Sequence, residues 1–112
     1  MEIPEDGHLL RIFIGEADKH EGKPLYEWLV TEARRRGLAG ATVMRGMMGF
    51  GPGSRVYTSK ILRLSEDLPI IVELVDSREK LEAFLEIADE VVEAGMATLE
   101  KAQIHLYRAT KK

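Results

Sequence analysis

Several features are missing from this chain, and each absence excludes a class of protein. None of the 112 residues is a cysteine, which excludes a disulfide framework, a thiolate metal site and a cysteine nucleophile. The longest apolar run, residues 68–72, contains a proline and is far too short to span a bilayer. The formal net charge is −3, which argues against broad nucleic-acid binding because that function needs a basic face. Residues 1–7 lack the positive charges of a signal peptide, so the predicted location is the cytoplasm.

The sequence also lacks a catalytic or metal-binding constellation. His8, His20 and His105 stand far apart, and none has a second ligand at helical or strand spacing, so each is predicted to be structural or solvated. The serines at 54, 59 and 65 have no visible base partner, so a triad cannot be argued. The carboxylates of residues 79–93 fit the solvated face of a helix. The prediction is a protein that is not an enzyme and binds no metal.

The length predicts a single domain over residues 1–112. Apolar and β-branched residues predict strands at 8–15, 41–48, 68–75 and 102–109. Apolar positions three and four apart predict one helix from Pro24 to Gly37 and another from an N-cap at Ser77 to Gly95. Residues 16–22 and 96–98 are predicted to be connections, residues 55–64 an extended insertion and residues 65–67 a turn.

This order predicts an α+β fold, a ferredoxin-like βαββαβ sandwich. Its antiparallel sheet carries both helices on one face, with an extra extended segment after the second strand. The chain has no further helix to cover the other sheet face, on which Leu9, Phe13, Met44 and Tyr107 are expected. Such a face is better buried in a homo-oligomer.

A glycine-dense stretch follows the second predicted strand. Gly49-Phe50-Gly51-Pro52-Gly53 is flanked by Arg45 and Arg55. Glycine backbone offers N–H groups without side-chain obstruction, and arginine offers forked donors that match phosphate oxygens. The stretch therefore predicts an anion site, with a simple hairpin tip as the alternative. It is neither a P-loop nor a dinucleotide fingerprint, so the motif alone is weak.

Several segments in order resemble one family over nearly the whole chain. They are GLAGATV (37–43), RGMMGFG (45–51), SRV (54–56), LSEDLPIIVE (64–73) and GMATLE (95–100). Together they resemble the nitrogen-regulatory PII-like signalling proteins, and most closely the PII-like family catalogued as domain-of-unknown-function 190.

The resemblance implies a homotrimer whose sheets line the centre, with an adenine nucleotide bound in the cleft between subunits. It implies no separate cofactor. Arginines are expected to pair with phosphate, and residues 49–51 to provide backbone donors. Thr42 matches a threonine of the family, and Gly95 stands where its second glycine loop begins. The nucleotide-binding residues so implied are Thr42, Arg45, Gly46, Gly49, Phe50, Gly51, Arg55, Gly95, Met96 and Arg108.

The chain departs from the PII pattern in three places. The long PII loop is shortened and lacks its modification tyrosine, for which Tyr57 is no substitute. The spacing from Thr42 to Gly49 is one residue longer, and the second glycine loop has no glycine-flanked lysine to hold phosphates. These departures weaken the case for 2-oxoglutarate sensing and for triphosphate binding, and favour AMP or ADP.

The resulting functional prediction is a cytoplasmic trimeric regulator. Binding of the nucleotide would order residues 51–67 and alter contact with an unidentified protein partner, for which a membrane transporter or channel is one option. One alternative is a structural or interaction module with no small ligand. Another is a small ferredoxin-like enzyme or a trimer of the metal-tolerance type.

Overall fold

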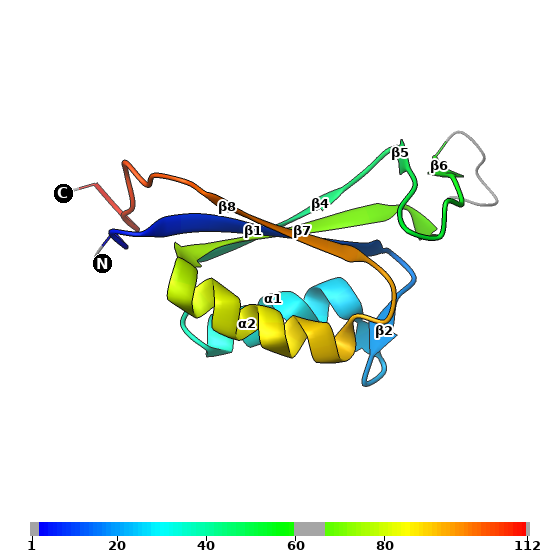
Figure 1. Cartoon of the computed structure of the whole chain (residues 1–112), viewed down its shortest axis with the longest axis horizontal. Helices are drawn as coiled ribbons and strands as arrows, with labels where there is room; N and C mark the ends of the chain where they lie inside the picture. The colour runs from blue at the N-terminus through cyan, green and yellow to red at the C-terminus, as the bar shows by residue number, and fades with distance from the viewer. Residues whose placement is uncertain (1–2, 60–66, 112) are drawn as a thin grey trace.

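The computed structural model describes residues 3–59 and 67–111. Within them the chain forms a four-stranded sheet with two helices on one face and a short two-stranded arm at one end (Figure 1). No helix in the described residues is long and apolar enough to cross a membrane. The elements in chain order are β1 (Gly7–Gly15), β2 (Lys19–His20), β3 (Lys23–Pro24), α1 (Leu25–Arg35), β4 (Gly40–Arg45), β5 (Met48–Gly49), β6 (Tyr57–Thr58), β7 (Pro69–Ser77), α2 (Arg78–Val91) and β8 (Met96–Lys101).

The main sheet has the strand order β4-β7-β1-β8, and every neighbouring pair is antiparallel. β1 and β7 occupy the centre and pair over their full length, from Gly7 opposite Ser77 to Gly15 opposite Pro69. Both helices lie against the same face of this sheet (Figure 1). The predicted ferredoxin-like sandwich is therefore confirmed.

The core lies between this sheet face and the helices. Alternate residues of the two central strands point to the helices, because side chains of a strand alternate between faces. They meet one apolar stripe from each helix, and Leu10, Leu29, Val72, Leu74 and Leu81 are fully buried there. The whole cluster comprises Leu10, Ile12, Ile14, Leu25, Leu29, Ala33, Ile70, Val72, Leu74, Leu81, Phe84 and Ala88.

The helix ends follow the sequence signals in part. Pro24 is the N-cap residue, so α1 begins one residue later, and Gly37 follows its end with a φ of +76°, a conformation that favours glycine. The Ser77 side chain accepts a hydrogen bond from the Lys80 amide at 3.3 Å, which confirms the predicted N-cap. The second helix stops at Val91, short of the predicted Gly95.

A buried carboxylate ties the start of β4 to the end of β7. Asp76 is only 4% exposed and accepts hydrogen bonds from the Ala39 amide at 2.8 Å and the Ser77 amide at 2.6 Å. Both bonds satisfy backbone groups at points where the chain leaves regular structure. The edge strand β4 is thereby held at the residue just before its start.

The predicted last strand is wrong. The structure places β8 at Met96–Lys101, across the predicted connection 96–98, and residues 102–109 form no strand. β8 pairs with β1 from Phe13 back to His8, and the Ala102 amide then donates to the Gly7 carbonyl at 2.9 Å. β1 begins at Gly7, so the residues after 102 have no further strand to pair with.

Other predicted boundaries also change. The second strand, expected to reach residue 48, stops at Arg45. The Gly46 amide still donates to the Pro69 carbonyl at 2.7 Å, but β7 begins at Pro69 and offers no further partner. Residues 16–22, expected to be a loop, include β2, which forms a short hairpin with β3. Within the predicted insertion 55–64, β6 is a strand. Residues 60–66, including most of the predicted turn at 65–67, lie outside the described residues.

The contact at Gly95 yields a stability prediction. A Cβ atom on this residue would stand 2.4 Å from the Phe13 carbonyl oxygen, so backbone would have to move. We expect Gly95→Ala to lower the free energy of unfolding by about 2–4 kcal/mol, measured by urea denaturation at fixed protein concentration. Gly40→Ala is the control because a Cβ there meets no atom within 4 Å. Equal stabilities of the two variants would contradict the close approach of Gly95 to β1.

Candidate functional site

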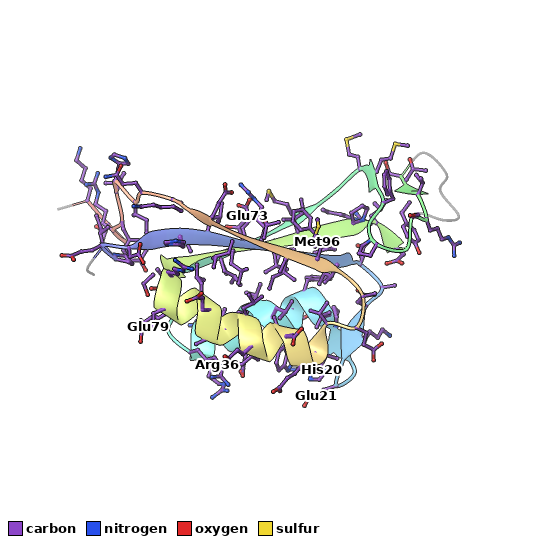
Figure 2. The ribbon with its side chains drawn as sticks, in the orientation of Figure 1. His20, Glu21, Arg36, Glu73, Glu79 and Met96 are labelled. Atoms are coloured by element: carbon purple, nitrogen blue, oxygen red, sulfur yellow. The ribbon has the colours of Figure 1, made fainter. Side chains whose placement is uncertain are left out.

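The sheet face opposite the helices is not covered by any described element of the chain. Glu73 and Met96 lie on this side, away from α1 and α2 (Figure 2). The register places Met44, Ile71, Phe13 and Met96 in one row across all four strands. Met44 is 39% exposed and Met96 is 49% exposed. We call the sheet face opposite the helices the open face; its exposed apolar row is of the kind that marks an interaction site.

An ion cluster occupies the middle of the open face. The Arg11 Nε donates to Glu73 Oε2 at 2.8 Å, and the other side of its guanidinium contacts Glu100 on β8. The hydrogen bond from Arg11 to Glu73, followed by the contact with Glu100, raises the pKa of the arginine. The cluster joins three strands and contains one more negative than positive charge.

The glycine-dense stretch forms an arm at the end of the sheet. β5 and β6 pair at Met48–Thr58 and Gly49–Tyr57, and in Figure 1 this arm extends away from the helices. The Ser59 amide donates to the Met47 carbonyl at 2.9 Å. Met47 is 77% exposed and Phe50 is 71% exposed, so the arm presents apolar side chains outward.

A cavity of about 410 Å³ lies between the arm and the open face. Its volume is in the range of small-molecule pockets. Residues from β1, β5, β6, β7 and the start of β8 line it, together with the loop between β5 and β6 and the segments after β1 and before β8. The lining consists of Phe13, Ile14, Gly15, Asp18, Gly46, Met48, Gly49, Phe50, Gly51, Pro52, Gly53, Ser54, Arg55, Tyr57, Asp67, Pro69, Ile71, Ala94, Gly95 and Met96.

Two glycines are needed for the shape of this cavity. A Cβ on Gly49 would lie 3.1 Å from Pro69 Cγ, so a side chain there would move the arm or Pro69 by a few tenths of an ångström. A Cβ on Gly95 would strike the Phe13 carbonyl. Gly51 and Gly53 have no such neighbour within 4 Å, and their backbone is open to a ligand.

The charged groups of the cavity are few. Among its described lining residues, Arg55 is the only cation, and its guanidinium carbon lies 5.4 Å from the centre of the Tyr57 ring. Asp18 and Asp67 are the acidic lining residues. Arg45 does not line the cavity; its Nη2 is 3.1 Å from Glu16 Oε1.

The structure brings most of the predicted site residues together. Seven of them line the cavity: Gly46, Gly49, Phe50, Gly51, Arg55, Gly95 and Met96. Thr42 lies on β4 opposite Glu73, outside the lining. Arg108 follows Tyr107, whose hydroxyl donates to the Ala39 carbonyl at 2.7 Å. That part of the chain is at the other end of the sheet from the arm (Figure 1), so Arg108 is remote from the cavity.

The sequence analysis assigned no binding role to two sheet residues that line the cavity, or to its two aspartates. Phe13 and Ile71 belong to predicted strands and carry no predicted binding role, although they form part of the lining. Asp18 and Asp67 stand in segments predicted to be a loop and a turn. Only Asp67 could have been nominated from the sequence, because it belongs to LSEDLPIIVE, one of the segments that carry the family resemblance. Nothing local in the sequence pairs it with Asp18.

Two of the three histidines, His8 and His20, have structural surroundings, whereas His105 is exposed. His8 is 8% exposed, with Nδ1 2.9 Å from the Asp6 carbonyl oxygen, and His20 meets Trp28 edge to face at 4.6 Å between ring centres. In residues 3–59 and 67–111, no group of three or more histidine, aspartate or glutamate side chains is arranged to hold a metal ion.

Comparison with known sequences gives a family match over most of the chain. The model of DUF190, described as "Uncharacterized ACR, COG1993", matches residues 7–104. A UPF0166 protein of Aquifex aeolicus (strain VF5) is 41% identical over 96 residues, which cover 86% of this chain and 90% of the relative. A UPF0166 protein of Methanocaldococcus jannaschii is 38% identical over 84 residues, covering 75% of this chain and 77% of the relative.

Comparison with solved structures gives a PII-like fold. The chain is similar to CPII, a nitrogen regulatory PII-like protein from Thiomonas intermedia K12, in its structure bound to ADP, AMP and bicarbonate. The TM-score is 0.64 at 20% identity, with 88% of this chain and 87% of CPII covered. The structure of CPII bound to ADP and bicarbonate gives a TM-score of 0.62 with the same identity and coverage.

Proposed function

Because the chain belongs to the DUF190 family and has a PII-like fold, we propose that it is a cytoplasmic homotrimeric regulator that binds an adenine nucleotide, AMP or ADP. The nucleotide binds in a cleft between subunits, and its binding changes the contact with a protein partner. The protein is not an enzyme in this proposal. A membrane transporter or channel is one kind of partner that a regulator of this type can serve.

The observation that carries the proposal is the cavity between the arm and the open face. Its lining contains seven of the ten residues that the sequence nominated for nucleotide binding. CPII, a protein of the same fold, is bound to ADP and AMP in its solved structure. Fold similarity alone does not establish function, so the support comes from agreement between the fold and the local chemistry.

The chemistry of the cavity suits a nucleotide with few phosphates. Phe50, Met48 and Met96 offer apolar and polarisable surface to a purine ring. Arg55 offers a forked cation to a phosphate, and the open backbone at Gly51 and Gly53 offers N–H donors without obstruction.

The open face supports the trimer. Phe13, Ile71 and Met96 belong both to the open face and to the cavity, so a second subunit seated on this face would also close the cavity. The segment after β8, which contains Arg108, lies at the end of the sheet opposite the arm (Figure 1). In the proposed assembly Arg108 reaches a nucleotide only in a neighbouring subunit. The arm, with Met47 and Phe50 exposed, is the segment placed to pass a change at the cavity to a partner.

Calorimetry with AMP, ADP and ATP tests the binding proposal. We expect binding to the wild-type protein, and Gly49→Val to weaken it by about tenfold or more, because added bulk at Gly49 meets Pro69. Ala83→Val is the control, because Ala83 is exposed on α2, on the side of the sheet away from the open face. Absence of binding by the wild type at millimolar nucleotide would refute the proposal.

The two arginines beside the cavity are predicted to differ. Arg55→Gln should weaken AMP binding by about tenfold or more, because a charge-assisted hydrogen bond is lost. Arg45→Gln should change the affinity less than about threefold, since Glu16 already engages that guanidinium. Each affinity is measured by the same calorimetric titration. A larger loss for Arg45→Gln than for Arg55→Gln would reverse the assignment.

The trimer is tested by a charge on the open face. Met44→Glu should convert the trimer to monomers at micromolar protein, because an unpaired carboxylate would be buried in the interface. Light scattering after size-exclusion chromatography measures the mass, and circular dichroism verifies the fold. Ala83→Glu is the matched control because Ala83 is exposed on α2, on the helical side. A wild-type protein that is monomeric at this concentration would refute the assembly.

A further inference from the structure

Two carboxylates converge at one end of the cavity. A Cβ atom placed on Gly15 would lie 2.6 Å from Asp67 Oδ1 and 3.4 Å from Asp18 Oδ1, so both side chains meet above the end of β1. Both residues line the cavity and are half-buried. They come from segments far apart in the chain and are adjacent only because β1 ends opposite the start of β7.

These carboxylates are held in place by backbone groups. Asp18 Oδ2 accepts from the Gly15 amide at 3.0 Å, and Asp67 Oδ1 accepts from the Ala17 amide at 2.9 Å. The amides at this end are therefore already satisfied and are not available to a phosphate. The second oxygen of each carboxylate accepts no hydrogen bond from residues 3–59 and 67–111, so it can accept one from a ligand.

The cation of the lining belongs to a different part of the cavity wall. Arg55 is on the segment between β5 and β6, where its guanidinium lies over Tyr57 on the arm. The cavity thus combines an acidic wall at Gly15 with an arginine and open glycine backbone on the arm. A ligand that fits both walls presents hydrogen-bond donors to the carboxylates and one anionic group to the arm.

We propose that Asp18 and Asp67 are specificity-determining residues that restrict the cavity to ribonucleotides of low charge. This inference rests on the proposed nucleotide function and deepens it. A monophosphate meets Arg55 while its ribose hydroxyls or base amine donate to the carboxylates, as acidic residues accept from ribose in other nucleotide sites. Each further phosphate adds negative charge to a cavity that already holds two carboxylates, and this repulsion is strong where water is partly excluded.

The test compares AMP, ADP and ATP by isothermal titration calorimetry at constant ionic strength, with EDTA present to remove divalent cations. For the wild-type protein we expect the dissociation constant to rise from AMP to ADP to ATP. In Asp18→Asn and in Asp67→Asn, the ratio of the ATP to the AMP dissociation constant should fall by about tenfold. Asparagine retains an oxygen for the Gly15 or Ala17 amide, so each variant keeps its backbone hydrogen bond.

Glu79→Gln is the matched control. It removes the same charge from an exposed position at the start of α2, remote from the arm (Figure 2). The ratio should remain unchanged in this variant, and thermal melting of all three variants verifies folding. The two aspartate variants are independent, so loss of fold in one leaves the other as the test.

The outcomes separate this inference from the proposed function. If the wild type binds adenine nucleotides but ATP binds as tightly as AMP, or if neither aspartate variant changes the ratio, the role of the carboxylates is refuted and the binding function stands. If no adenine nucleotide binds to the wild type or to any variant, the proposed function itself fails.

Discussion

The antiparallel pairing of β1 with β7 is the constraint on which the rest of the structure depends. It runs over nine residues of each strand, and the alternation of side chains along both strands puts one complete apolar set against the helices. A slip of one residue would turn that set to the opposite face. Once this register is set, β4 and β8 can join only at the outer sides, and both helices cover the same face. Because both helices cover one face, the open face is left without a covering element from the described residues.

The same pairing positions the cavity. The pairing of β1 with β7 ends where Gly15 lies opposite Pro69, and hydrogen bonds tie the surrounding loops to that point. The Gly46 amide donates to the Pro69 carbonyl, and the Glu16 amide donates to the Leu68 carbonyl. The candidate site is therefore built from loops held by the rim of a rigid sheet, which is the usual location of binding residues. Its floor, from Phe13 to Ile71, belongs to the sheet itself.

The open face and the cavity differ in how their charged side chains are paired. Arg11 is held between Glu73 and Glu100 at the centre of the open face, and Arg45 is engaged by Glu16 at the rim. A subunit docking on this face would meet mainly apolar side chains around an internally paired cluster. The cavity instead retains an arginine on one wall and two carboxylates on another. The charged groups that a ligand can contact therefore lie where the open face meets the arm.

The sequence by itself determined the central strands and both helices, because apolar periodicity is a local property. Its glycine spacing marked residues 49–53 but did not predict that β5 and β6 pair beside them. It did not determine the last strand. Residues 102–109 alternate as a strand should, but the hydrogen-bond partner is supplied by β1, and β1 pairs with Met96–Lys101. Nor did it join Asp18 to Asp67, or separate Arg108 from the cavity. These relations arise between residues distant in the chain, and only the register of the folded sheet decides which of them come into contact.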